Sequence, residues 1–187
     1  MKESPWRIIA SSYVIDTRFL RLRKDAVELP DGSRVNDYYV RESRGFAVIF
    51  ARTADGKIVL VRQYKHGIGK TLIELPAGAI DAGESSDEAA IRELAEETGY
   101  AAGRLEHVRS FVTDPTNSNA VAHLFYAQGV TKSAAQKLDA TENITVELAN
   151  ASEVLAMVRD GRIDCMPHVA AIYFMLDRLG ESPPSQL

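Results

Sequence analysis

Residues 78–100 read GAIDAGESSDEAAIRELAEETGY, and this stretch carries seven acidic side chains, four of which surround Arg92. Helix faces rich in Glu, Lys and Arg are usually solvated surface. Carboxylates crowded on one turn can instead hold a metal ion, and oxygen ligands without a nearby histidine or thiolate favour Mg²⁺ or Mn²⁺ over zinc. The two interpretations to separate are therefore a solvated helix face and a metal site.

The helix within this stretch can be placed from its end signals. Ser85 and Glu88 form a capping-box pattern, and Gly99 suits the position just after a helix. These signals predict a helix from Ser86 to Thr98. At 3.6 residues per turn, four side chains share one face that we expect to pack on a sheet: Ile91, Leu94, Ala95 and Thr98.

The acidic side chains are expected on the other side of this helix. Glu93 and Glu97 are four residues apart, with Glu96 beside them. Like charges at this spacing destabilise a helix by a few tenths of a kcal/mol, roughly, whereas a divalent cation between them would make the arrangement attractive. Arg92 stands four residues from both Glu88 and Glu96, so we expect it to hold part of the array in place.

The composition of the whole chain narrows the class of protein. Its 187 residues, 45% hydrophobic, suit one domain or one domain with a small addition. The formal net charge of −4 gives no support to a nucleic-acid backbone as the main partner. A single cysteine, Cys165, excludes an internal disulfide framework, and the N-terminus has no hydrophobic signal run. We therefore expect a cytoplasmic protein.

The first part of the chain has the pattern of antiparallel strands. Three β-rich segments precede residue 44, and Asp31-Gly32 predicts a hairpin between the last two: WRIIASSYVI, FLRLRKDAVELP and SRVNDYYVRES. A three-stranded sheet of this size is marginal alone and must pack on the main domain or on another subunit. We expect an N-terminal β-domain at residues 1–43 and a main domain at residues 44–187.

The main domain alternates between strand and helix patterns. FAVIFA and KIVLVRQY are typical of buried strands joined by a hairpin, and three further strand-like segments follow the acidic helix: LEHVRSFVT, AVAHLFYAQGV and ITVELA. Two helices, Ser152–Arg159 and Pro167–Leu179, are expected to close the chain. This order predicts an α/β/α sandwich around a mixed sheet.

The acidic stretch resembles the Nudix box at every specified position. Gly78, Glu84, the run Arg92-Glu93-Leu94-x-Glu96-Glu97 and Gly99 have the spacing of that motif. The resemblance implies a Mg²⁺-dependent hydrolase, with Mn²⁺ as a possible substitute, that cleaves nucleoside diphosphates linked to another group. It implies that Glu93, Glu96, Glu97 and the backbone carbonyl of Ala77 are metal ligands. It also implies that Arg92 and Glu84 organise the loop of the catalytic site.

Other segments are similar to the ADP-ribose pyrophosphatase branch of this family. They are VRQYKHG, IELPAGAID, ENITVELA and Pro115, which lies fifteen residues after Tyr100. That branch implies a homodimer that exchanges its N-terminal β-domains. It also implies a glutamate on the loop before the last strand, as catalytic base or further metal ligand; here this is Glu142, with Asp139 as the alternative.

Substrate contacts follow less directly from the resemblance. The branch often has an arginine where this chain has Lys65, which offers a point charge in place of a bidentate fork. Arg62 and Arg44 are further candidates for a phosphate. Trp6, Tyr38 and Tyr39 are aromatic candidates for stacking on a base. We assign no role to the four histidines, which lack ligand spacing, or to Cys165, which we interpret as a buried small residue.

Several functions remain open at this point. The expected reaction is hydrolysis of ADP-ribose to AMP and ribose 5-phosphate. Relatives of that branch carry a glycine and a glutamate after the proline, whereas residues 116–120 here read TNSNA, so GDP-mannose, ADP-glucose or a dinucleotide are alternatives. The β-rich N-terminus and the ELPAG segment disfavour a nucleoside triphosphate hydrolase, and the acidic composition gives an RNA cap hydrolase no support. A non-catalytic ligand sensor is disfavoured because all the acids of the box are present.

Overall fold

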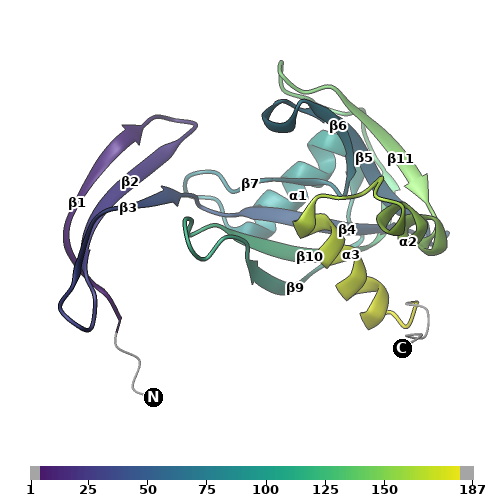
Figure 1. Cartoon of the computed structure of the whole chain (residues 1–187). Coiled ribbons are helices and arrows are strands. Elements are labelled where there is room, and N and C mark those ends of the chain that lie inside the picture. Colours follow the sequence, from purple (N-terminus) through teal and green to yellow (C-terminus); the bar gives the residue numbers. More distant parts are fainter. Residues whose placement is uncertain (1–4, 182–187) are drawn as a thin grey trace. The chain divides into compact units, whose positions relative to one another are not determined.

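The computed structural model describes residues 5–181 (Figure 1). The chain divides into two compact units. One unit comprises the chain up to Gly45 together with Val112–Val121, and the other comprises Phe46–Phe111 and the chain from Ala122 onward. The connection between two strands of the main unit therefore belongs to the N-terminal unit.

The N-terminal unit contains a three-stranded antiparallel sheet in the order β1-β2-β3. Its strands are β1 (Arg7–Asp16), β2 (Arg21–Glu28) and β3 (Arg34–Glu42). The hairpin between β2 and β3 forms at the predicted position, where Gly32 adopts a φ of 85° that favours glycine. Asp31 Oδ1 accepts a hydrogen bond from the Ser33 N–H at 2.9 Å, which closes the turn.

The main unit is built on an eight-stranded sheet (Figure 1). Its central path runs β11-β5-β4-β10-β8, while β6, β7 and β9 pair with β5, β4 and β10. The pair β4–β10 is parallel and the pair β4–β5 is antiparallel, so the sheet is mixed. The strands are β4 (Phe46–Thr53), β5 (Ile58–Lys65), β6 (Lys70–Glu74), β7 (Ala77–Ala79), β8 (Tyr100–Ala101), β9 (Arg104–Val112), β10 (Val121–Lys132) and β11 (Ile144–Ala149).

Helices cover both faces of this sheet. Alternate residues of β4 point to opposite sides. Ala47 and Ile49 pack in the cluster that includes Leu94 of α1 (Ser86–Thr98). Val48 and Phe50 pack in the cluster formed with α2 (Ala151–Arg159) and α3 (Met166–Arg178). The predicted α/β/α sandwich around a mixed sheet, with its small N-terminal antiparallel sheet, is confirmed.

The predicted bounds of α1 are correct, but the predicted buried face is only partly correct, since Leu94 and Thr98 are buried and the other two residues are not. The Ser85–Glu88 capping box is formed at the start, and Gly99 adopts a φ of 72° at the end. Ile91 is 54% exposed and Ala95 is exposed, whereas Glu97 is buried. The helix approaches the sheet through the small side chains of Ala89 and Ala90, both fully buried, and this turns the Glu97 side inward.

None of the α-helices described between residues 5 and 181 combines the length and the apolar character that a membrane span requires.

Candidate metal and active site

Glu97 is a buried carboxylate in the last turn of α1. Glu97 is 3% exposed, and its Oε2 accepts a hydrogen bond from the Ala77 N–H at 3.0 Å. Within residues 5–181, no lysine, arginine or histidine forms an ion pair with it. Burial raises the pKa of Glu97 to about 8, and the charge of Glu93 adds to this rise. A buried carboxylate without a cationic partner either holds a proton or needs a bound cation to balance its charge.

Glu93 lies one turn before Glu97 and against the backbone of Gly78. A Cβ atom placed on Gly78 would lie 2.0 Å from both Cδ and Oε1 of Glu93. Only glycine leaves room for the carboxylate at this point. Burial raises the pKa of Glu93, although Arg92 opposes the rise. The chain segment that begins at Ala77 therefore faces the carboxylates of both residues.

Arg92 connects α1 to the loop that precedes it. Its guanidinium donates two hydrogen bonds to Glu84, from Nε at 2.7 Å and from Nη2 at 2.9 Å, and a third to the Ala79 carbonyl at 3.0 Å. Glu84 also accepts a hydrogen bond from the Asp81 N–H at 3.0 Å. The bonds from Arg92 lower the pKa of Glu84 to about 2. This bidentate pair fixes the shape of the loop before the helix.

The predicted partners of Arg92 on the helix are only partly correct. Arg92 Nη1 bonds Glu93 at 2.7 Å and Glu96 at 3.2 Å. The expected pair with Glu88 does not form, because the Glu88 carboxylate caps the helix by accepting from the Ser85 N–H at 2.8 Å. Arg92 thus neutralises the outer part of the carboxylate array and leaves Glu97 without an ion pair.

The ion pair between Arg92 and Glu84 leads to a prediction about stability in acid. The pKa of Glu84 is lowered from 4.5 to about 2 in the folded protein. Stability from this pair is therefore complete above the unfolded value and is lost as pH falls from 4.5 toward 2. We expect Glu84→Gln to lower the free energy of unfolding by about 1–3 kcal/mol at neutral pH and by much less in strong acid. Urea unfolding at several pH values measures this, and an equal loss at every pH would contradict it.

The polar segment after β10 is joined to the end of α1. The Lys137 N–H donates to the Glu96 carbonyl at 2.9 Å. The Gln136 side chain donates to the carbonyls of Glu97 at 2.6 Å and Ile144 at 3.1 Å. The loop between β10 and β11 carries Glu142, and these hydrogen bonds from Gln136 hold its two ends together. Sequence reasoning did not find Gln136, because a glutamine in a polar segment carries no distinguishing pattern.

Comparison with known proteins shows to which family the chain belongs. The NUDIX domain model matches residues 42–169, which include Gly78, Arg92 and all the acids of α1. The chain belongs to the Nudix family. A second model, described as the nucleoside diphosphate sugar hydrolase N-terminal domain, matches residues 6–40.

Two curated relatives match most of the chain. A methanol dehydrogenase activator of Bacillus methanolicus is 34% identical over 90% of this chain and 91% of its own length. An ADP-ribose pyrophosphatase of Bacillus subtilis is 30% identical over 87% and 88%. A solved structure described as an ADP compounds hydrolase matches with a TM-score of 0.81, covering 97% of this chain and 100% of that one. At 21% identity it supports the fold alone.

Glu142 lies on the loop whose ends Gln136 joins, near Glu93 and Glu97, which are called the Nudix acids below together with Glu96. The loop forms a turn in which the Asp139 N–H donates to Glu142 Oε2 and the Glu142 N–H donates to the Asp139 carbonyl, both at 2.9 Å. Burial is the main cause of the raised pKa of both Glu93 and Glu97, and the negative charge of Glu142 adds to it. The structure thus brings Glu142 within electrostatic reach of the two carboxylates.

Of the two basic candidates on β5, only Lys65 lies close to the Nudix acids. Its ammonium forms an ion pair with Glu74 at 3.0 Å, and its positive charge offsets part of the rise that burial causes in the pKa of Glu97. Arg62 is exposed, and it pairs with Glu147 on the neighbouring strand at 2.5 Å. Because alternate residues of a strand face opposite sides, Arg62 and Lys65 do not share a face of the sheet.

The remaining candidates belong to the N-terminal unit. Trp6 is 48% exposed and packs edge-on against Tyr38 at 5.6 Å between ring centroids, while Tyr39 is 40% exposed. Arg44 is exposed and follows the end of β3. Pro115 lies in Val112–Val121, the segment between β9 and β10 that belongs to the N-terminal unit.

The loop after Pro115 explains part of the departure from the family pattern. Asn117 accepts from the Arg41 N–H at 2.8 Å through its carbonyl, and the Ser118 hydroxyl donates to the Arg41 carbonyl at 3.0 Å. Asn119 Oδ1 accepts from the Ser43 N–H at 2.7 Å. Residues of the TNSNA segment therefore attach this loop to β3.

Proposed function

We propose that the protein is a Mg²⁺-dependent pyrophosphohydrolase of nucleoside diphosphate sugars, with ADP-ribose as its principal substrate. The observation that carries the proposal is the buried Glu97 carboxylate, which lies beside Glu93 without an ion pair among residues 5–181. The similarity to the Bacillus subtilis ADP-ribose pyrophosphatase supports the substrate class. So does the match of residues 6–40 to the nucleoside diphosphate sugar hydrolase N-terminal domain.

The residues around Glu97 suit a hard divalent cation. We propose the carboxylates of Glu93, Glu96 and Glu97 and the backbone carbonyl of Ala77 as its ligands. These donors are all oxygens, which Mg²⁺ and Mn²⁺ prefer. The close approach of Glu93 to Gly78 supports a shared site, because it brings a carboxylate against the chain next to Ala77.

The reaction adds water across the pyrophosphate bond of ADP-ribose. The water oxygen forms a new P–O bond, the bridging P–O bond breaks, and AMP and ribose 5-phosphate leave. A bound Mg²⁺ would supply Lewis-acid polarisation of the phosphate oxygens. We propose that the Glu142 carboxylate accepts the proton of the attacking water, and that the Lys65 ammonium stabilises negative charge on a phosphate. Arg92 and Glu84 keep the loop before α1 in place.

Residues of the N-terminal unit are proposed to contact the rest of the substrate. Trp6 and Tyr39 offer aromatic faces for the base, and Arg44 offers a guanidinium for a phosphate. Pro115 and the loop after it are proposed to shape the sugar end. Arg62 stays a weaker candidate, because its guanidinium is already paired with Glu147.

A substrate panel tests this function. We would measure phosphate release, after coupling to a phosphatase, from ADP-ribose, ADP-glucose, GDP-mannose, UDP-glucose, NADH, a dinucleoside polyphosphate and nucleoside triphosphates, with Mg²⁺ or Mn²⁺. We expect the highest kcat/KM for ADP-ribose. Preference for a nucleoside triphosphate would contradict the proposed class. No turnover of any compound, despite metal binding, would favour a ligand sensor.

We also propose that the protein is a homodimer formed through the N-terminal sheet. Every residue of β1 is exposed, and this edge strand together with the chain around it presents large apolar side chains: Trp6, Ile8, Ile9, Tyr13, Val14, Ile15, Phe19 and Leu20. Such a surface is costly to leave in water, and a second copy of the same sheet would cover it.

The dimer can be tested by sedimentation equilibrium. We expect the wild type to sediment as a dimer and Ile8→Asp/Val14→Asp to sediment as a monomer, because two buried charges would oppose association. A matched double change at exposed polar positions of β3, Asn36→Asp/Asp37→Asn, should leave the dimer intact. A monomeric wild type at the concentrations used in the activity assay would contradict the proposal.

A further inference from the structure

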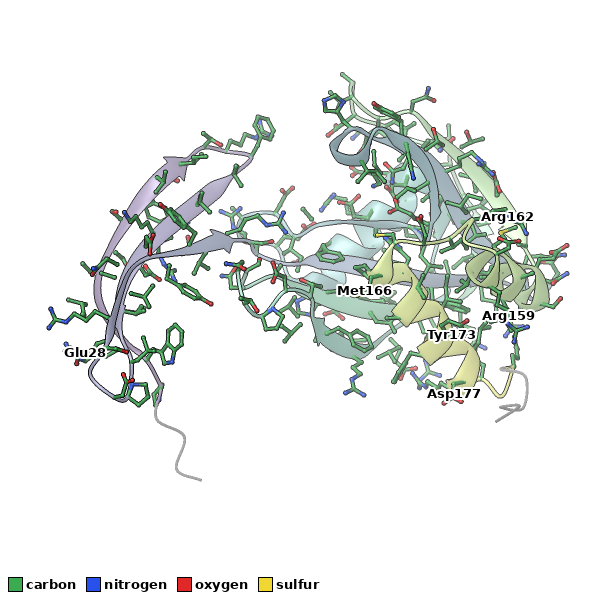
Figure 2. The ribbon with its side chains drawn as sticks, in the orientation of Figure 1. Glu28, Arg159, Arg162, Met166, Tyr173 and Asp177 are labelled. Carbon is green, nitrogen blue, oxygen red and sulfur yellow. The ribbon has the colours of Figure 1, made fainter. Side chains whose placement is uncertain are left out.

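A second cluster of ionisable side chains lies where β6 ends and α3 begins. Glu74 is the last residue of β6 and is 3% exposed, and His168 is 6% exposed. α3 begins at Met166, labelled in Figure 2, so that His168 lies in its first turn and Cys165 just precedes it. Potential ligand atoms of Glu74, Cys165 and His168 lie within 4.8 Å of one another.

These three residue types could bind zinc, but their hydrogen bonds oppose it. The Leu75 N–H donates to His168 Nδ1 at 3.2 Å, so the lone pair on this nitrogen is already used. Burial lowers the pKa of His168 to about 4, and the neutral ring must then carry its proton on Nε2, which lies 3.4 Å from Glu74. Burial also raises the pKa of the Cys165 thiol to about 11. In this tautomer the His168 ring has no free lone pair for zinc, and the Cys165 thiol would have to release its proton on binding.

The cluster instead fixes a short piece of chain that leads into the Nudix box. Leu75 and Pro76 connect β6 to Ala77 at the start of β7. His168 accepts the Leu75 N–H, the Pro76 carbonyl accepts from the Ile49 N–H at 2.9 Å, and the Ala77 N–H donates to Glu97. Pro76 has no N–H of its own. Both backbone N–H groups between Glu74 and Gly78, those of Leu75 and Ala77, are therefore hydrogen-bonded to side chains.

We propose that His168 is a positioning residue for the metal site, acting through the backbone of Leu75. Its Nδ1 sets the position of the chain two residues before Ala77, whose carbonyl is the proposed ligand. Glu74 acts one step further out, because its carboxylate beside Nε2 favours the tautomer in which Nδ1 is the acceptor. The inference rests on the proposed function, since it assigns His168 of α3 to the same metal site.

Two substitutions at one position separate this role from simple packing. In His168→Asn the side-chain oxygen can occupy the place of Nδ1 and accept the Leu75 N–H. In His168→Gln the amide nitrogen can occupy the place of Nε2 and face Glu74, but no acceptor remains for Leu75. Both variants bury an amide in place of an imidazole, so they share the general cost of the change.

The readout is Mn²⁺ binding by the 187-residue chain, measured as free Mn²⁺ by electron paramagnetic resonance. We expect His168→Gln to weaken Mn²⁺ binding about tenfold and His168→Asn to bind as the wild type does. Thermal melting in EDTA identifies variants that have not folded. Equal Mn²⁺ affinity in both variants, whether weakened or normal, would overturn the positioning role.

Two further outcomes are distinguishable. A Zn²⁺ affinity that falls in Cys165→Ser would show that the cluster is itself a metal site, and would overturn the proposal. If the wild type neither binds Mn²⁺ nor hydrolyses any substrate of the panel, the proposed function fails and this inference fails with it. Loss of the difference between Asn and Gln in an active, Mn²⁺-binding protein would overturn the inference alone.

Discussion

Glu97→Gln is expected to fold at least as stably as the wild type in EDTA, yet to lose turnover by about 100-fold or more. The side chain is 3% exposed, and burial raises its pKa to about 8, so the charged carboxylate is unfavourable in the metal-free protein. A neutral amide avoids that cost, and we expect the free energy of unfolding at mildly alkaline pH to rise by about 1–3 kcal/mol. The same amide binds Mg²⁺ poorly, because it carries no charge.

The control for this variant removes an acid from the same helix without touching the site. Asp87 is exposed in the first turn of α1, so Asp87→Asn should keep wild-type turnover. The measurements are urea unfolding in EDTA and kcat with saturating Mg²⁺. If Glu97→Gln retained near-normal turnover, or if it unfolded more easily than the wild type in EDTA, the assignment of Glu97 as a ligand would be wrong.

Gly78→Ala is expected to lower kcat/KM strongly while the melting temperature changes little. The new Cβ would lie 2.0 Å from the Glu93 carboxylate, which is the free end of a flexible side chain. The protein can therefore fold by moving the carboxylate, with little loss in melting temperature. Because displacement of a catalytic group by about 1 Å can cost about 100-fold in rate, we expect kcat/KM to fall by roughly that factor.

Gly67 provides the matched glycine. A Cβ at Gly67 would meet nothing within 4 Å, and its φ is not positive, so Gly67→Ala should leave both melting temperature and kcat/KM unchanged. Normal activity in Gly78→Ala would mean that Glu93 does not need its observed position. A large fall in melting temperature would instead mean that Gly78 is required for the fold.

The sequence was sufficient for those parts of the structure that depend on local signals. The capping box at Ser85 and the glycine after Thr98 placed α1 correctly. The hairpin at Asp31-Gly32 formed where turn chemistry predicts it. Runs such as FAVIFA became buried strands, because each is bounded by turn residues and is apolar on both faces.

Features that depend on tertiary contacts were not predictable in the same way. The periodicity of α1 placed Ile91 on the buried face, whereas the structure buries Glu97, whose carboxylate accepts from the Ala77 N–H. Short strands such as β7 and β8, of three and two residues, carry no periodicity to detect. His168 and Gln136 act through backbone groups that are distant in the sequence, so no motif identifies them.

We propose that the acids of α1 hold a divalent cation for hydrolysis of a nucleoside diphosphate sugar. The most direct test is to quantify AMP and ribose 5-phosphate released from ADP-ribose by the wild type while Mg²⁺ is titrated into EDTA-treated protein. We predict equal amounts of both products, with no release in EDTA and a rate that saturates with Mg²⁺. Release that persists in EDTA, or no release at saturating Mg²⁺, would contradict the account.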